Sequence, residues 1–283
     1  MTFSVRPLTD TFGVEVENID ISGPLSATEF KQVQELWHQH ELLLFRNQTL
    51  VETDMIEFSR RFGELEIHVR EEWLSDDNPE ILMVTNVKKN GQSVGALEDA
   101  EVGWHYDQIY LARPAVGSLL SSVKLPPDGG STYFADMSTA YETLPTHLRE
   151  AIDGRSAVQS YSAFNQSYST ETNDTQTKKT QDVEHPIVRT HPFTGRKSLY
   201  ICPGMSIKII GLPEDESKQV LEECFAWSIK PEFVYQHDWQ LGDSLLWDNA
   251  CTMHRRDPFD GDQFQRIMKR TTILPPVKMA VPF

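Results

Sequence analysis

The segment His105-Tyr-Asp107 places an imidazole and a carboxylate two residues apart. On a β-strand, side chains at positions i and i+2 point to the same face, so both groups could bind one metal ion. His254 is a candidate third ligand, because it follows a strand-like stretch, Leu245–Cys251, that could lie beside the first segment. Two histidines and one carboxylate on one face of a metal leave other positions open, as in non-haem Fe(II) oxygenases.

A His-x-Asp pair alone is weak evidence for a metal site, since most histidines are packed or surface polar groups. His38 and His40 lie at the end of a predicted helix, where they would interact favourably with its dipole. Four further histidines have no partner at metal-ligand spacing, and we interpret them as structural or surface groups: His147, His185, His191 and His237.

Arg266 and Arg270 are four residues apart and would share one face of a strand. Two arginines inside a β-core are costly unless they meet anions. They are therefore either surface groups on a solvated strand or a receptor for carboxylates, which the planar guanidinium group can grip with two hydrogen bonds. Five basic residues gather within 16 positions of this region: Arg255, Arg256, Arg266, Lys269 and Arg270.

The whole chain is acidic, with 26 Lys+Arg against 42 Asp+Glu and a net charge of −16. This charge argues against nucleic acid or an anionic membrane as a partner, although a small anion responds to local charge. No apolar run is long enough to span a membrane, and no signal peptide is visible. The three cysteines include no Cys-x-x-Cys motif, so we expect a cytoplasmic protein.

The elements that must position these residues are short strands with a few helices between them. Ser26-Ala-Thr-Glu29 is a capping box that predicts a helix behind it. Further helices are expected over Asp54–Phe62, from Ser138 towards Ile152, and over Glu214–Trp227. Strands are expected near 42–45, 81–84, 117–123, 131–134, 187–189, 198–201, 232–235, 244–247 and 271–274.

This pattern favours a mainly β fold with flanking helices (α+β), a sandwich or barrel, over a doubly wound parallel sheet. We expect a single domain over residues 1–283. Residues 160–184 are crowded with Ser, Thr, Asn, Gln and Asp, which is typical of a lid or a disordered loop. Because Tyr161, Phe164 and Tyr168 could close over a ligand, we expect an active-site lid there.

Taken together and in order, several motifs resemble the taurine dioxygenase/2,4-D dioxygenase family over nearly the whole chain. They are Leu43-Leu-Phe-Arg46, Arg61-Phe-Gly-Glu-Leu65, Trp104-His105-x-Asp107, Pro127-x-Gly-Gly-x-Thr132, Ala135-Asp136-Met137, Tyr141-Glu-Thr-Leu-Pro145, Trp247-Asp-Asn249 and Arg266-x-Met-x-Arg270-x-Thr-Ile. The resemblance implies a double-stranded β-helix (jelly-roll) core and an enzyme that depends on Fe(II), 2-oxoglutarate and O2. The central region is nearer to the phenoxyacetate-degrading branch.

The resemblance also assigns the metal and cosubstrate residues. His105, Asp107 and His254 match the iron ligands. Thr132 and Arg266 match the residues that hold the distal carboxylate of 2-oxoglutarate.

Three further residues match substrate positions of the family. Arg270 matches a position that meets an anionic group of the primary substrate, and His68 resembles a substrate-contacting histidine. Gln108 stands where taurine enzymes carry an aliphatic residue, and Arg70-Glu71-Glu72 replaces an aromatic one, so taurine itself is not the expected substrate.

The implied reaction is hydroxylation of a small carboxylate or sulfonate, followed by bond cleavage where the attacked carbon bears a heteroatom. Related halogenases lack the carboxylate that Asp107 provides. We expect a homo-oligomer, a dimer or a tetramer. Two alternatives remain at this point: a zinc-dependent hydrolase with the same His/Asp/His site, and a non-catalytic ligand-binding relative.

Overall fold

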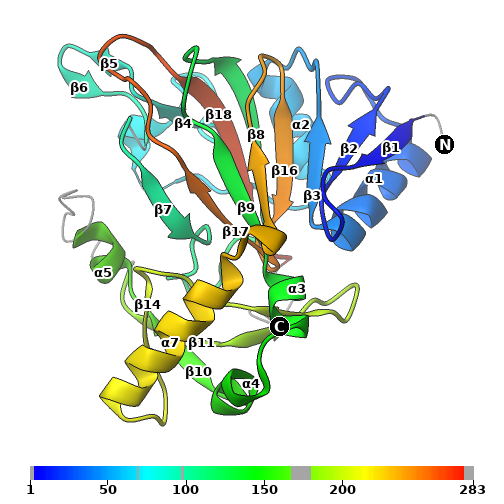
Figure 1. Cartoon of the computed structure of the whole chain (residues 1–283). Helices are drawn as coiled ribbons and strands as arrows, with labels where there is room; N and C mark the ends of the chain where they lie inside the picture. The colour runs from blue at the N-terminus through cyan, green and yellow to red at the C-terminus, as the bar shows by residue number, and fades with distance from the viewer. Residues whose placement is uncertain (1–2, 69, 97–98, 167–179, 277–283) are drawn as a thin grey trace.

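Two β-sheets and a helical layer form the molecule, which we describe from a computed structural model covering residues 3–68, 70–96, 99–166 and 180–276. In Figure 1 the two sheets lie in the upper part. The lower part contains α3 (Met137–Glu142), α4 (Thr146–Ile152) and α7 (Glu214–Ser228), with the three-stranded sheet β11-β10-β14. These strands are β10 (Ser156–Gln159), β11 (Val183–Pro186) and β14 (Ser206–Ile209).

The larger sheet has seven strands in the order β1-β2-β3-β16-β8-β18-β4. All neighbours are antiparallel except β2 and β3. The strands are β1 (Ser4–Pro7), β2 (Val14–Glu17), β3 (Leu42–Phe45), β16 (Ser244–Asp248), β8 (Gly117–Lys124), β18 (Ile267–Ile273) and β4 (Leu82–Thr85).

The smaller sheet is fully antiparallel, in the order β15-β9-β17-β7. Its strands are β15 (Val234–His237), β9 (Thr132–Asp136), β17 (Thr252–Arg256) and β7 (Val102–His105). The remaining described strands form two two-stranded sheets: β5 (Lys88–Lys89) with β6 (Gln92–Ser93), and β12 (Val188–Thr190) with β13 (Lys197–Leu199). Two 3-10 turns, Glu71–Trp73 and Pro231–Phe233, and the short helix α5 (Tyr161–Gln166) complete the described elements.

Alternating side chains of β3 show how the layers are held together. Leu42 and Leu44 belong to the core between the two sheets, which also contains Phe134 of β9. Leu43 and Phe45 point the other way, into a second core beneath α1 (Ala27–His40) and α2 (Glu52–Arg60). A strand that is buried on both faces has an unbroken run of apolar residues in its sequence. This is why the run Leu42–Phe45 predicted a strand. The expected mainly β fold with flanking helices is confirmed.

Local differences from the sequence predictions have identifiable causes. The capping box at Ser26 is present, but α2 begins and ends two residues earlier than predicted. The helix predicted from Ser138 to Ile152 is two helices, α3 and α4, because Pro145 disfavours helical geometry at the residue before it. Asp136, not Ser138, caps α3, by accepting a hydrogen bond from the Thr139 amide at 2.8 Å.

The boundaries of two predicted strands also shift. The first two residues of the strand predicted at 232–235 lie in a 3-10 turn, so β15 starts at Val234. The strand predicted at 271–274 is the end of the longer β18.

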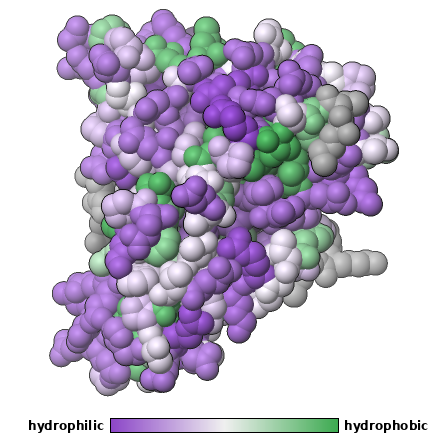
Figure 2. Space-filling model, turned by 45° about the vertical axis from the view of Figure 1, so that its right-hand side comes forward, coloured by the Kyte–Doolittle hydropathy of each residue, from purple (hydrophilic) through white to green (hydrophobic). Residues whose placement is uncertain are grey.

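Within the described ranges, no helix has both the length and the apolar character needed to cross a membrane. The face shown in Figure 2 is mainly hydrophilic, with hydrophobic side chains in small patches.

Gly117, the first residue of β8, allows α1 to approach the larger sheet. A Cβ atom there would lie 2.7 Å from the Trp247 carbonyl oxygen and would also overlap the Trp37 ring. Because this core cannot yield, we expect Gly117→Ala to lower the free energy of unfolding by about 1–3 kcal/mol. Chemical denaturation measures this loss. Gly23→Ala is the control, since nothing lies within 4 Å of its added Cβ; equal stability of the two variants would contradict the packing account.

Candidate active site

His105 and His254 face each other across two strands of the smaller sheet. They are directly paired in the antiparallel register of β7 and β17, and their ring centroids are 4.1 Å apart. Opposite residues on neighbouring strands point to the same face of a sheet. The pairing of the two strands therefore brings these two imidazoles together, as the sequence suggested for His254.

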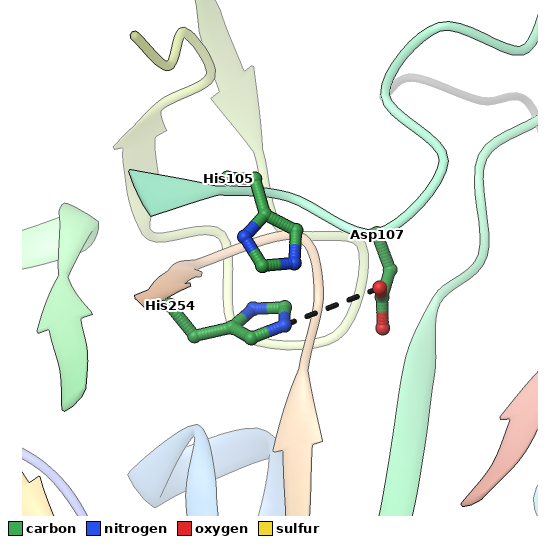
Figure 3. Close-up of side chains that lie close together, drawn as sticks. All are labelled: His105, Asp107 and His254. Carbon is green, nitrogen blue, oxygen red and sulfur yellow. Dashed lines mark ion pairs between the residues drawn. The ribbon is translucent and has the colours of Figure 1, made fainter. Parts of the chain in front are cut away.

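Asp107 reaches the same point by a different route from the one predicted. Strand β7 ends at His105, and Asp107 lies in the turn that follows, where Gln108 has a left-handed φ of 58°. The prediction that strand alternation aligns His105 with Asp107 is therefore wrong, and a turn performs this task. The potential ligand atoms of the three buried residues all lie within 4.8 Å of one another (Figure 3).

Hydrogen bonds fix both oxygens of the Asp107 carboxylate. Oδ1 accepts from Arg270 Nη1 at 2.9 Å, and Oδ2 accepts from Ser118 Oγ at 2.8 Å. Burial opposes ionisation, but Arg270, the two histidines and Ser118 outweigh it and hold the pKa of Asp107 well below its usual range. The carboxylate is therefore charged at neutral pH, as a metal ligand must be.

The two histidines are held in the neutral state that binds metal. Burial is the main cause that lowers the pKa of His105 and, more strongly, of His254. His105 Nδ1 lies 2.8 Å from the Gly103 carbonyl oxygen, to which it donates, so its Nε2 lone pair is available. The donor set of two neutral imidazoles and one carboxylate fits a divalent transition metal.

Arg266 and Thr132 both lie beside the indole ring of Trp239. Trp239 Nε1 donates to Thr132 Oγ1 at 2.9 Å, and the same indole ring lies 5.9 Å from the Arg266 guanidinium carbon. Arg266 is only 2 % exposed, and its Nε has no hydrogen-bond partner among the described residues. Burial, with Arg256 nearby, lowers the pKa of Arg266 to about 9. Arg266 Nη2 donates to the Gly130 carbonyl oxygen at 3.3 Å, but no carboxylate among the described residues balances the buried charge of this guanidinium.

Both arginines predicted to share a strand face are buried, so the surface interpretation of Arg266 and Arg270 is wrong. They serve different partners. Arg270 Nη1 is paired with Asp107, while its buried Nε has no hydrogen-bond partner in the described part of the chain. The second interpretation, a receptor for carboxylates, agrees with these unpaired donors.

A cavity of about 490 Å³ opens onto the metal-binding residues His105 and Asp107. Its lining includes the three predicted substrate residues, His68, Gln108 and Arg270, and four aromatic side chains, Trp73, Tyr110, Tyr161 and Phe164. Among the described residues, Thr132, His254 and Arg266 are not part of this lining.

Part of the predicted lid lies at this cavity. Tyr161 and Phe164 belong to α5, and the Phe164 ring lies 6.0 Å from the His105 ring. The Tyr161 and Tyr110 rings lie 4.6 Å apart. Residues 167–179, which include Tyr168, lie outside the described residues, so the prediction of a lid over 160–184 is not tested there.

Ser118 and the aromatic residues Trp73 and Tyr110 were missed by the sequence analysis. Ser118 is fully buried in β8, but Ser121 and Ser122 are buried in the same strand, so no sequence signal singled out Ser118. Trp73 lies in the 3-10 turn after His68, and its ring is 6.0 Å from the His68 ring. Tyr110 lies in the same turn as Asp107, whereas Ser118 and Trp73 come from other segments, to which no spacing rule connects Asp107.

A second buried cluster of His191, Asp248 and Cys251 has donor atoms within 4.8 Å of one another. The Thr194 amide donates to His191 Nδ1 at 3.2 Å, so His191 Nε2 carries the proton and donates to Asp248 Oδ2 at 3.0 Å. A metal on Nε2 would place a proton on Nδ1 against that amide. Burial also raises the pKa of the Cys251 thiol. The hydrogen bonds therefore fit the predicted structural role of His191.

The lowered pKa of half-buried His68 predicts that the free energy of unfolding depends on pH. Burial, together with Arg270 and Arg70, lowers its pKa to about 4, whereas an unfolded histidine has a pKa of about 6.5. Between these values the unfolded chain binds a proton that the folded chain does not, so stability falls as the pH falls. We expect His68→Gln to gain stability relative to the natural chain from about pH 6.5 to about pH 4, measured by urea unfolding. A constant difference over this range would contradict the assignment.

Comparisons with known proteins agree with this architecture. Residues 4–272 match the taurine catabolism dioxygenase TauD, TfdA family. The chain is 33% identical to an alpha-ketoglutarate-dependent 2,4-dichlorophenoxyacetate dioxygenase of Cupriavidus pinatubonensis, over 96% of this chain and 98% of the relative. It is 32% identical to an (S)-phenoxypropionate/alpha-ketoglutarate-dioxygenase of Sphingobium herbicidovorans, over 96% of this chain and 94% of the relative.

A solved structure supports the same assignment. The crystal structure of AAD-2 in complex with Mn(II) and N-oxalylglycine superposes with a TM-score of 0.81 at 31% identity, and covers 98% of each chain. The strand-rich fold, the His/Asp/His group and the full-length matches lead to one conclusion. The chain belongs to the taurine catabolism dioxygenase TauD, TfdA family, and is an oxidoreductase of the dioxygenase class.

Proposed function

We propose that this protein is an Fe(II)- and 2-oxoglutarate-dependent dioxygenase that hydroxylates a small organic anion. In the balanced reaction, 2-oxoglutarate, O2 and a substrate C–H give succinate, CO2 and a substrate C–OH. The observation that carries the proposal is the combination of the buried His105, Asp107 and His254 group with the buried Arg266, whose Nε has no hydrogen-bond partner among the described residues. The first would hold the metal and the second would hold the cosubstrate.

The metal site fits iron by its donor chemistry. Two imidazoles and one carboxylate are the ligand set of non-haem Fe(II) oxygenases. When bound, the iron would bring O2 and the cosubstrate together and supply the oxidation. The chain itself contributes the charged carboxylate of Asp107, the neutral histidines and their fixed orientation.

The cosubstrate site fits the distal carboxylate of 2-oxoglutarate. Arg266 offers a buried, unpaired Nε–H, and Thr132 offers a hydroxyl beside the same Trp239 ring. N-oxalylglycine, present in the AAD-2 structure, has the dicarboxylate skeleton of 2-oxoglutarate with one CH2 replaced by NH. A zinc hydrolase is not favoured, because hydrolysis gives no reason to bury Arg266 with an Nε that has no hydrogen-bond partner among the described residues.

The cavity suggests the class of primary substrate. Arg270 lies in its wall with an unpaired Nε–H, which would bind an acid group, and Gln108 and His68 lie in the same lining. The aromatic walls suit a flat apolar body. We propose an aryloxy acid or a similar carboxylate or sulfonate; the names of the two relatives refer to phenoxy acids. Hydroxylation at a carbon that bears the ether oxygen would release the aryl group.

Packing supports treating residues 1–283 as one domain, because β9 and β3 each contribute side chains to two of the three hydrophobic cores. We propose that α5 is the described part of a cover that excludes water from the oxidised centre, since Phe164 lies over the cavity beside His105. Self-association as a dimer or a tetramer stays a prediction, as does the cytoplasmic location.

Substrate-dependent release of succinate tests the reaction directly. The natural chain, supplied with Fe(II), 2-oxoglutarate and air, is screened against aryloxy acids, sulfonates and amino acids. We expect at least one aryloxy acid or sulfonate to stimulate succinate formation, and Asp107→Ala to abolish it, because the metal loses its charged ligand. Asp10→Ala, which changes an exposed carboxylate, is the control. Retained turnover in Asp107→Ala would remove Asp107 from the ligand set.

Arg266→Gln tests the cosubstrate site separately. Loss of a buried charged hydrogen-bond partner costs about 2–5 kcal/mol, so we expect the KM for 2-oxoglutarate to rise at least about 30-fold. The kcat at saturating cosubstrate should change much less, because the metal ligands are untouched. Arg61→Gln, a change of an exposed arginine, should leave the KM unchanged. An unaltered KM in Arg266→Gln would mean that the cosubstrate binds elsewhere.

A further inference from the structure

The side chain of Asn249 holds the backbone of Asp107 from both sides. Its Oδ1 accepts from the Asp107 amide at 2.9 Å, and its Nδ2 donates to the Asp107 carbonyl at 2.7 Å. The second Nδ2 proton is donated to the Ala115 carbonyl at 2.9 Å. Asn249 is fully buried, and it uses both donors and its acceptor on backbone groups.

This contact joins the two segments that carry the metal-binding residues. Asn249 lies in the turn between β16 and β17, five residues before His254, which belongs to β17. Asp107 lies in the turn after β7, where Gln108 adopts the left-handed φ of 58° that few non-glycine residues take. Such a turn persists only when surrounding contacts determine it, and Asn249 supplies two of them at the ligand itself.

The turn that carries Asn249 is itself firmly held. The Asn249 amide donates to the Val116 carbonyl at 2.9 Å. Asp248 Oδ1 accepts from the Ala250 amide at 2.8 Å, and Asp248 Oδ2 accepts from His191. The buried pair of His191 and Asp248 thus fixes the turn from which Asn249 reaches Asp107.

We infer that Asn249 is a positioning residue that sets the Asp107 carboxylate on the metal. It touches neither metal nor substrate, and acts through the Asp107 backbone. The inference rests on the metal site of the proposed function, but not on the cosubstrate or the reaction. Without the Asn249 amide, two buried backbone groups of Asp107 lose their partners, and the turn that carries the carboxylate is held less firmly, although Arg270 and Ser118 still bind the carboxylate oxygens. Partners of this kind are worth about 10- to 100-fold in metal affinity.

Mn(II) binding to the full-length apoprotein, without 2-oxoglutarate, tests the inference without any turnover. Two variants are compared with the natural chain. Asn249→Ala removes all three hydrogen bonds. Asn249→Asp keeps the size and the acceptor towards the Asp107 amide, and in the protonated form that burial favours it keeps one of the two donors. We expect Asn249→Ala to raise the Kd for Mn(II) about 10- to 100-fold, and Asn249→Asp to raise it less. The electron paramagnetic resonance spectrum of bound Mn(II) should also differ between Asn249→Ala and the natural chain.

Gln48 provides a matched control outside the site. Its side-chain amide also makes three hydrogen bonds to the backbone: it accepts from Ile21 and donates to Ile19 and Arg46. Gln48→Ala should lower the free energy of unfolding, yet leave the Kd for Mn(II) within twofold of the natural value. A purely structural role of Asn249 would make the two alanine variants alike in metal affinity.

The outcomes separate the two proposals. If both Asn249 variants bind Mn(II) within twofold of the natural chain, or if Gln48→Ala weakens binding equally, the positioning role is wrong and the metal site stands. If the natural chain fails to bind Mn(II), the metal site itself is wrong. Should Asn249→Ala fail to fold, as judged by near-ultraviolet circular dichroism, Asn249→Asp decides the question, because it preserves the volume of the side chain.

Discussion

The buried carboxylate of Asp107 is the group on which the rest of the site depends. A charge removed from water is tolerated only when it is paired and hydrogen-bonded. Arg270 and Ser118 satisfy its two oxygens, and both come from the larger sheet, on β18 and β8. His105 and His254 come from the smaller sheet. The His105, Asp107 and His254 group therefore exists only where the two sheets meet, and the packing of the two sheets is a condition for the proposed chemistry.

The two buried arginines explain how an acidic protein can recruit anions. Arg270 Nη1 is paired with the protein's own Asp107, and its Nε–H would be available to the acid group of the proposed substrate. Arg266 lacks a carboxylate partner among the described residues, and burial, with Arg256 nearby, lowers its pKa. The net charge of −16 keeps polyanions away, while these two guanidinium groups act at short range on small ones.

Sequence reasoning succeeded where local patterns determine the structure. The capping box at Ser26 and the apolar run Leu42–Phe45 are local signals, and both were recovered. The proximity of His105 and His254 was anticipated, although their direct pairing depends on the strand register. The turn at Asp107 could not be predicted, because Gln108 gives no sign of its left-handed φ and the contacts of Asn249 that hold the turn come from 142 residues away.

The central claim is that one chain binds Fe(II) and 2-oxoglutarate at the same site. Anaerobic titration of 2-oxoglutarate into the Fe(II)-loaded protein, followed by visible absorption, tests it most directly. The account predicts a weak charge-transfer band that saturates at one iron and one 2-oxoglutarate per chain, because the keto acid chelates the metal. Absence of the band, with Fe(II) shown to be bound, would contradict the account.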